Sequence, residues 1–222
     1  MAKQKKKPKK KYHKPSDPIM GQSDIPFVLR SQYKHQAKVN HWREYSARVV
    51  LYGMSIALHR VKNVGYRRLI RFSQVYEQNE NEIYEDGVEV GLVKAKKRMD
   101  EMRLGISGEL YAVPDVGGTI RDQDVANQSS EATQVALTAA AITMNDVFGY
   151  GETVQIQIHD EFSAVMAEYG KAGKGMKYLL DEMKKIGFAI VNGKAVFYLD
   201  EEGKTLTPGQ TKKLLGAAKG QA

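Results

Sequence analysis

The sequence predicts a mainly α protein with short β-hairpins, an α+β arrangement built as a tandem, degenerate repeat of one unit of three helices and a hairpin. Apolar residues recur every three or four positions over long stretches, which is typical of amphipathic helices. The dipeptide Asn192-Gly193 between two apolar runs is a strong hairpin signal. Residues 49–65 align without a gap on residues 135–151, with five identical positions, and such self-similarity indicates a repeat.

The internal match continues beyond the aligned segments. Three further apolar positions correspond: Ile70 with Ile156, Phe72 with Ile158 and Tyr76 with Phe162. After a slip of five residues, the run 99–102 (Met-Asp-Glu-Met) matches the run 180–183 (Leu-Asp-Glu-Met), and a glycine lies a few residues after each. Because the matches occur in the same order, we interpret them as the trace of a duplication.

The predicted elements follow the same order in each copy. Residues 25–48 are expected to form a helical entry. A first helix, apolar on more than one face and so expected to be buried, ends near Val61 in one copy and near Val147 in the other. A glycine-containing turn and two further amphipathic helices follow. The expected buried stripes are Tyr66, Leu69, Ile70 and Tyr76, then Leu92, Ala95, Met99 and Met102 in the first copy, and Ile158, Phe162, Val165 and Tyr169, then Met176, Leu179, Leu180 and Met183 in the second.

A short hairpin closes each predicted copy. In the second copy it joins residues 188–191 to residues 194–199, and in the first a weaker signal lies over residues 106–113. The chain is accordingly divided into a disordered basic tail (1–24), a basic first unit (25–113), a polar, turn-rich linker (114–133), an acidic second unit (134–202) and a basic C-terminal tail (203–222). We expect the second unit to fold by itself.

Charge is distributed unevenly along the chain, whose net charge is +8. Residues 1–18 carry eight lysines against one aspartate, whereas residues 114–202 carry fourteen acidic residues against seven basic ones. A lysine-rich segment with little apolar surface does not fold alone, and it suits a dense row of negative charge such as a phosphate backbone or an anionic membrane. Nucleic acid, with DNA favoured over RNA, is therefore the expected partner. A solubilising arm is the alternative. The tail residues assigned to this contact are Lys5, Lys6, Lys7, Lys9, Lys10 and Lys11.

The two glycine turns resemble the helix-hairpin-helix motif, hydrophobic-x-Gly-hydrophobic-Gly. They read Val61-x-Asn63-Val64-Gly65 and Val147-x-Gly149-Tyr150-Gly151. The resemblance implies binding to the DNA backbone without sequence preference, because a helix N-terminus can hold a phosphate through its N–H groups. Asn63 replaces the first glycine in one copy, and asparagine tolerates positive φ better than most residues. A plain corner between two helices with a glycine cap would give the same pattern.

Three helices followed by a hairpin also resemble a winged helix, which implies that the third helix enters the major groove. In the first copy this helix carries Lys94, Lys96, Lys97 and Arg98, and the second helix adds Arg67, Arg68 and Arg71 directly after the turn. An ordinary solvated face is the alternative. The second copy lacks those arginines. We infer that the first unit faces phosphate, while the acidic second unit supports it, forms a homo-oligomer or recruits a protein partner.

The helix–FGFG-like turn–helix pattern over residues 61–72 and 147–158 is similar to small proteins of bacteriophages and prophages of Gram-positive bacteria. This resemblance implies an origin in a phage or mobile element more than a particular activity.

Enzyme chemistry is not favoured by any motif, and neither a cofactor nor a metal site is predicted. The absence of cysteine excludes thiolate zinc sites and cysteine nucleophiles. In the glycine-rich run 170–177, Met176 stands where a phosphate-binding loop needs lysine. A Mg²⁺ nuclease cluster is conceivable but disfavoured; its members would be Asp115, Asp122, Asp124, Asp160 and Glu161. No apolar run reaches the length of a membrane span, so no membrane contact and a cytoplasmic location in a bacterial host cell are expected.

The function predicted from the sequence is therefore that of a non-specific DNA-binding accessory protein of a phage or mobile element, acting in replication, recombination or transcription. A protein–protein adaptor or virion-associated structural protein is one alternative. A sequence-specific transcriptional regulator is another.

Overall fold

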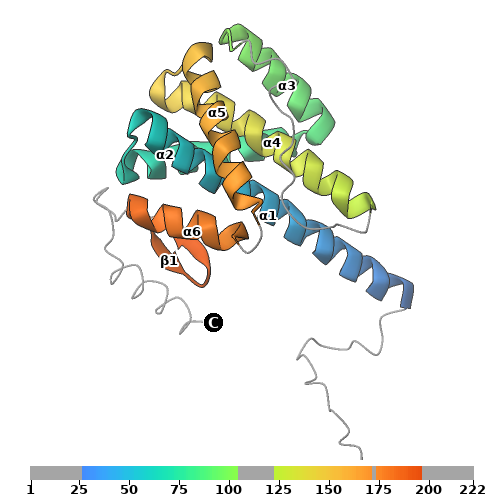
Figure 1. Ribbon diagram of the computed structural model, residues 1–222. Helices are drawn as coiled ribbons and strands as arrows, with labels where there is room; N and C mark the ends of the chain where they lie inside the picture. Colours follow the sequence, from blue (N-terminus) through green and yellow to red (C-terminus); the bar gives the residue numbers. More distant parts are fainter. Residues whose placement is uncertain (1–26, 105–122, 172–173, 197–222) are drawn as a thin grey trace, which may run out of the picture. The chain divides into compact units, whose positions relative to one another are not determined.

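The computed structural model describes residues 27–104, 123–171 and 174–196 (Figure 1). The chain divides into two compact units, residues 1–37 and residues 38–222. The first contributes only the beginning of α1 to the described residues, and the second holds all the other elements. The elements are α1 (Phe27–Lys62), α2 (Tyr66–Glu85), α3 (Val88–Glu101), α4 (Gln123–Phe148), α5 (Glu152–Tyr169), α6 (Gly175–Ile186), β1 (Ala189–Val191) and β2 (Lys194–Val196).

The predicted class is confirmed: the described chain is mainly helical and carries one short antiparallel hairpin. The first helices end at Lys62 and Phe148, one residue beyond the predicted ends. The predicted stripes on α2 and α5 are buried, except for the half-buried Tyr66. In each of the predicted stripes of α3 and α6, two residues are buried and two are half-buried. The buried ones are Ala95, Met99, Leu179 and Met183.

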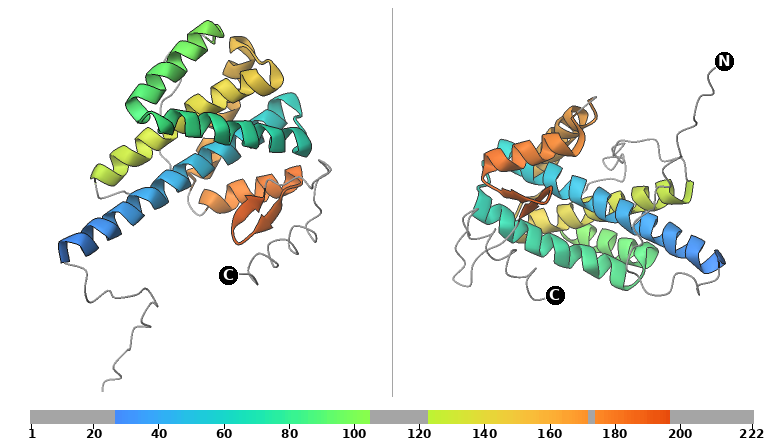
Figure 2. Two further views of the ribbon diagram at one scale, coloured as in Figure 1. Left: turned by 180° about the vertical axis from the view of Figure 1, so that it is seen from behind. Right: turned by 90° about the horizontal axis from the view of Figure 1, so that it is seen from below.

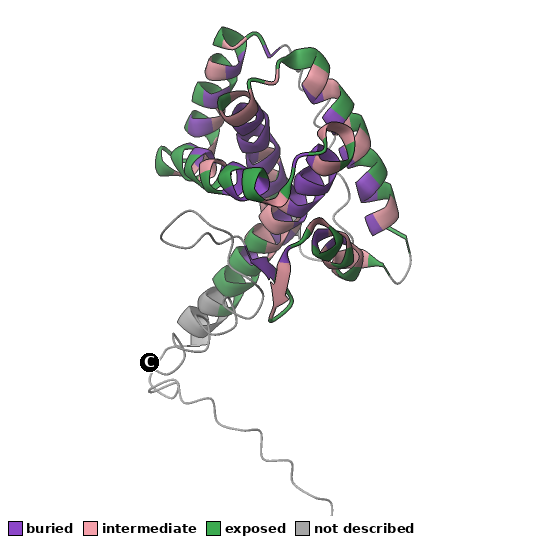
Figure 3. Ribbon diagram, turned by 90° about the vertical axis from the view of Figure 1, so that its left-hand side faces the viewer, coloured by how far each residue is buried: buried purple, intermediate pink, exposed green. Residues whose placement is uncertain are grey.

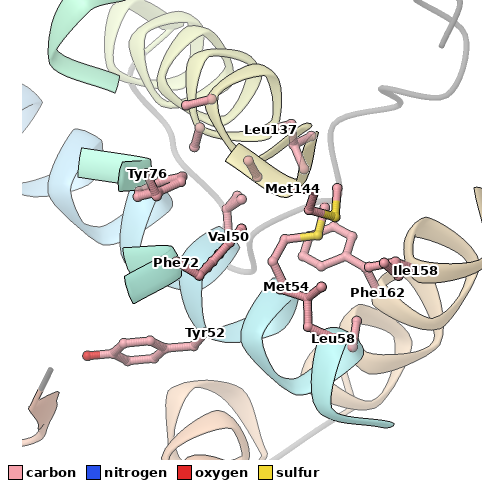
Figure 4. Close-up of a cluster of buried hydrophobic side chains, with 14 of the residues drawn as sticks. Val50, Tyr52, Met54, Leu58, Phe72, Tyr76, Leu137, Met144, Ile158 and Phe162 are labelled. Carbon is pink, nitrogen blue, oxygen red and sulfur yellow. The ribbon is translucent and has the colours of Figure 1, made fainter. Parts of the chain in front are cut away.

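Helices from the two halves of the chain pack on one another. α2 and α3 both lie against α4 (Figure 2), and Phe162 and Met166 of α5 lie against Gly53 of α1. The buried apolar side chains of both halves form one cluster. Figure 3 shows that the buried positions lie on the helix faces that are turned toward each other. Figure 4 shows Met54, Met144 and Phe162 converging from α1, α4 and α5.

The expectation that the second unit folds alone stays a prediction, but its buried apolar side chains share one core with those of the first unit. That core lies within the compact unit 38–222. Without α1, the ring of Phe162 would lose its contact with Gly53, and apolar surface would be exposed to water.

The predicted linker is also wrong over residues 123–133, because α4 begins at Gln123. Its polar composition reflects satisfied hydrogen bonds and not a loop. The hydroxyls of Ser46 and Ser129 are 2.7 Å apart and both residues are buried. The guanidinium of Arg43 donates to the side chains of Gln128 and Glu131. Buried polar groups with partners are compatible with a packed helix.

The hairpin forms at the predicted dipeptide. Asn192 and Gly193 both have positive φ, 51° and 71°, as a two-residue turn of this kind requires, and Val191 pairs with Lys194. The N–H of Ala195 donates to the hydroxyl of Tyr52 at 2.9 Å, which attaches the hairpin to α1. The weaker hairpin expected over residues 106–113, and the remainder of the predicted strand 194–199 beyond residue 196, lie outside the described residues.

The contact between α1 and α5 gives a test of the shared core. A Cβ at Gly53 would lie 2.6 Å from Phe162 Cε2 and 2.7 Å from Met166 Cε. We expect Gly53→Ala to lower the free energy of unfolding by about 1–3 kcal/mol, because overpacking outweighs the better helix propensity of alanine. Chemical denaturation measures the difference.

Gly170→Ala is the matched control, since its Cβ would meet only atoms at 3.5 Å or more and its backbone is right-handed. If Gly53→Ala were as stable as this control, the close seat of Phe162 would not be a constraint on the fold.

Candidate nucleic-acid interface

The two glycine turns have the same backbone conformation. Asn63 and Gly149 both have positive φ, 49° and 67°. Gly65 and Gly151 both begin the next helix in an extended conformation, with φ of −76° and −80°. In each turn, the residue before the second glycine donates its N–H to a carbonyl six residues earlier, over 3.4 Å from Val64 and 3.3 Å from Tyr150. The asparagine therefore substitutes for glycine without a change of turn.

The second glycine of each turn is not required by the fold. The φ values of Gly65 and Gly151 are open to any residue, and a Cβ at either would have no atom within 4 Å. Neither glycine supplies a side-chain cap. Their carbonyls accept the N–H groups of the third and fourth residues of each helix, Arg68 and Leu69 in α2 and Val154 and Gln155 in α5. Both turns thus leave open space in front of a helix N-terminus.

Phe148 brings the two turns together. The guanidinium of Arg68, three residues after the first turn, lies 5.0 Å from the centre of the Phe148 ring. The same ring stacks on Phe72 at 6.1 Å and contacts Tyr150 of the second turn at 5.1 Å. We call the surface made of residues 63–68, Arg71 and residues 148–151 the turn surface. Sequence reasoning missed Phe148, although an aromatic residue on either side of Gly149 was a signal for it.

Three arginines of α2 remain available on the turn surface. Arg67, Arg68 and Arg71 are exposed, and no carboxylate of the described residues forms an ion pair with them. Gly65, Tyr66, Arg67 and Arg68 line a shallow hollow of about 350 Å³. An anion that approached the N-terminus of α2 would meet both the guanidinium groups and the positive end of the helix dipole.

Other arginines of the first half are occupied by acids of the second half. Arg60 donates to Glu161 and Glu182, both at 2.8 Å, and to the hydroxyl of Tyr178 at 3.2 Å. Burial alone would lower the pKa of Arg60, but these hydrogen bonds outweigh it and raise the pKa. Arg43 pairs with Glu131 in the same way. Part of the charge difference between the halves is therefore an internal ion-pair network.

The predicted basic face of α3 is divided by the structure. Arg98 donates to Asp146 at 2.9 Å and to the side-chain oxygen of Asn79 at 3.0 Å, which holds α3 on α4 and α2. Lys94 pairs with Asp86 at 2.6 Å. Lys96 and Lys97 are exposed. Arg98 and Lys94 thus have structural partners, and two of the four predicted cations remain on the outer face.

The winged-helix resemblance stays a prediction; among the described residues, the β1–β2 hairpin follows α6 directly. Phe188, just before β1, packs edge-on against Tyr66 with ring centres 4.6 Å apart, so the hairpin lies beside the start of α2. Lys174 and Lys185 of the expected recognition helix pair with Glu168 and Glu182. The lysines of the N-terminal tail, Lys5 to Lys11, lie outside the described residues.

Among the described residues, no group of three or more His, Asp or Glu side chains is placed to bind a metal ion. Of the disfavoured nuclease cluster, Glu161 is paired with Arg60, and Asp115 and Asp122 lie outside the described residues. In the described part of the chain, none of the helices has the length and apolar character needed to cross a bilayer.

Comparison of the chain with protein-family models, with curated proteins and with solved structures finds no match. The geometry of the turn surface therefore has to be interpreted from its own residues.

The ion pairs between the halves predict a stability difference between two arginines. Arg60→Gln should lower the free energy of unfolding by about 1 kcal/mol, because a half-exposed pair contributes at this level and loses part of it in salt. Arg67→Gln removes the same charge from an unpaired, exposed position and should change stability by less than about 0.5 kcal/mol. Denaturation of both variants at low and high salt measures the contrast. Equal effects would mean that Arg60 does not join the halves.

Proposed function

We propose that this protein binds the backbone of DNA, without sequence preference, through the turn surface. Two glycine turns and the arginines of the first two turns of α2 would share this contact. The role we propose is that of an accessory protein of a phage or mobile element in replication, recombination or transcription. This wider role rests on the resemblance of residues 61–72 and 147–158 to small phage and prophage proteins.

The observation that carries the proposal is the contrast between two groups of arginines. Arg43, Arg60 and Arg98 are each held by carboxylates of the second half. Arg67, Arg68 and Arg71 are exposed and have no such partner within the described residues. Unpaired guanidinium groups beside a helix N-terminus are well suited to phosphate, for which they can donate two hydrogen bonds at once.

The turn glycines add independent support. Neither Gly65 nor Gly151 is needed to avoid backbone strain or to allow close packing. Close approach of a ligand to the backbone would explain why these positions have no side chain. Phosphate oxygens that came close to these turns could accept hydrogen bonds from the first N–H groups of α2 and α5.

The two turns would contribute unequally. The first turn of α5 begins with the exposed Glu152, which repels phosphate, whereas α2 begins with Tyr66, Arg67 and Arg68. We therefore assign the main phosphate contact to α2 and a supporting contact to the second turn.

We also propose that the two halves descend from a duplicated unit. The matched φ angles and hydrogen bonds of the turns support this. So does the reciprocal packing, in which α2 and α3 lie on α4, while α5 contacts α1 at Gly53 and α6 contacts it through Arg60.

A protein partner on the acidic second half is a weaker proposal. Four of its carboxylates are already paired with arginines of the first half: Glu131, Asp146, Glu161 and Glu182. The negative charge available to a partner or to a second copy is reduced accordingly.

Neutralising two arginines tests the main proposal. Arg67→Gln with Arg71→Gln should weaken binding to random-sequence duplex and reduce the magnitude of the log–log salt slope by about 2, as expected for two lost phosphate contacts. Arg68 is retained so that its contact with Phe148 persists. Fluorescence anisotropy across a salt series, with the full chain, gives the slope.

The control removes the same charge from α6. Lys177→Gln with Lys184→Gln replaces two exposed lysines, and we expect it to leave most of the slope in place. If both double variants behaved alike, the contact would come from net charge alone. A strong preference for one site over random DNA would favour a sequence-specific regulator instead, and binding unaffected by either variant would favour the adaptor or structural alternative.

The glycines give a second test. Gly65→Ser with Gly151→Ser should leave the free energy of unfolding unchanged or slightly raised, because serine caps a helix and restricts the unfolded chain. DNA affinity should fall about tenfold, equivalent to about 1.4 kcal/mol, since the hydroxyl would occupy the N–H groups that phosphate needs.

Gly170→Ser, at the other end of α5, is the control and should alter neither quantity. Loss of stability in the double variant would show that the glycines serve the fold, and unchanged affinity would remove the turns from the interface.

A further inference from the structure

A second candidate site lies away from the turn surface, in a groove between α1 and α2. It occupies about 850 Å³, within the range of small-molecule sites, which is roughly 300–1,000 Å³. Its α1 wall includes Arg43 and Arg48, and its α2 wall includes Tyr76, Glu77 and Glu80. We call it the α1–α2 groove.

Charges of both signs line the groove: Arg43, Arg48 and Glu44 on α1, Glu77 and Glu80 on α2, and Lys194 of β2. Arg43 pairs with Glu131 of α4, and Arg48 approaches Glu44 on its own helix at 3.7 Å. Among the ion pairs of the described residues, none joins an arginine of the α1 wall to Glu77 or Glu80. Cations and carboxylates therefore face each other across a space that the chain does not close.

Two residues that line this groove each have a buried polar atom without a hydrogen-bond partner. Tyr76 is only 3% exposed, and its hydroxyl has no partner within the described part of the chain. The Nε of Arg43 also has no partner there, although the Nη2 atom of the same guanidinium donates to Gln128 and Glu131. A buried polar group without a partner is unfavourable, so each requires an explanation. Both can donate to an oxyanion.

On the α2 wall, the Glu80 carboxyl lies where a cation would stabilise its charged form. Burial, with the neighbouring Glu77, raises the pKa of its carboxyl to about 7. Burial also raises the pKa of Tyr76, and Glu80 and Tyr84 add to the effect. A cationic group placed here would offset the desolvation of the carboxylate.

We propose that the α1–α2 groove binds a small zwitterion of the amino-acid or short-peptide type, with its carboxylate toward the α1 wall and Tyr76 and its ammonium toward Glu77 and Glu80. The balanced charge of the walls disfavours a polyanion, and the amide side chains of Gln74 and Asn81 can serve the polar groups between the two ends. This site is separate from the DNA contact.

The test compares two mixtures of dipeptides with the full chain. One mixture has free termini, and the other is acetylated and amidated so that both terminal charges are absent. We expect the free mixture, at millimolar concentration, to raise Tm and the capped mixture to leave it unchanged, because ligand binding to the folded state stabilises it. Titration calorimetry with single dipeptides then gives Kd. Equal shifts with both mixtures, or no shift with either, would overturn the proposal.

Variants separate binding from stability. Tyr76→Phe should raise the Tm of the ligand-free protein by about 2–4 °C, since it removes a buried hydroxyl without a partner, and should still weaken binding about five- to tenfold. Glu80→Gln should weaken binding by a similar factor. Glu85→Gln, an exposed carboxylate on the same helix outside the groove, is the control and should bind normally.

One outcome would overturn the proposal: free dipeptides do not raise the Tm of the unsubstituted protein, while Tyr76→Phe raises the Tm of the ligand-free protein. The Tyr76 hydroxyl would then contact water and no ligand. Binding that survived both Tyr76→Phe and Glu80→Gln would place the ligand elsewhere and would also overturn it. DNA binding and its salt slope should be unchanged in all three variants, which keeps this site distinguishable from the turn surface.

Discussion

The close approach of α5 to α1 at Gly53 governs the rest of the structure. Phe162 and Met166 can lie against α1 only because residue 53 has no side chain. With α5 seated there, Arg60 comes within hydrogen-bonding distance of Glu161 and Glu182, and the hairpin reaches Tyr52. On the other side, α2 and α3 pack on α4. Each half thus buries its apolar face on the other half, and a single core results.

This packing explains part of the distribution of charge. Here the arginines that face the second half meet its carboxylates within the same molecule. The charges left unpaired are more informative than the totals, because half-buried ion pairs satisfy their charges internally. The remaining cations of α2 gather beside two turns of the same conformation.

The polar interior follows the same logic. α4 begins with residues that read as a loop, yet Ser129 bonds to Ser46 and Gln128 to Arg43. Such pairs allow polar helices to pack closely, since each buried group finds a partner. Among the described residues, the buried polar atoms without a hydrogen-bond partner include the Tyr76 hydroxyl, the Nε of Arg43 and the Oε1 of Gln155, and of these residues Tyr76 and Arg43 line the α1–α2 groove.

Local patterns in the sequence were sufficient to predict the local structure. Helical periodicity identified the buried stripes of α2 and α5, and the turn residues placed the glycine corners and the hairpin at Asn192-Gly193. These features depend on neighbours a few residues apart, so a single sequence contains them. Tertiary structure alone decided which helices pair, where α4 begins, and which arginines are free. Ion pairs such as that of Arg60 with Glu182, and the contact of Arg68 with Phe148, join residues far apart in the chain. No local pattern encodes such contacts, because they arise from the packing of one half of the chain on the other.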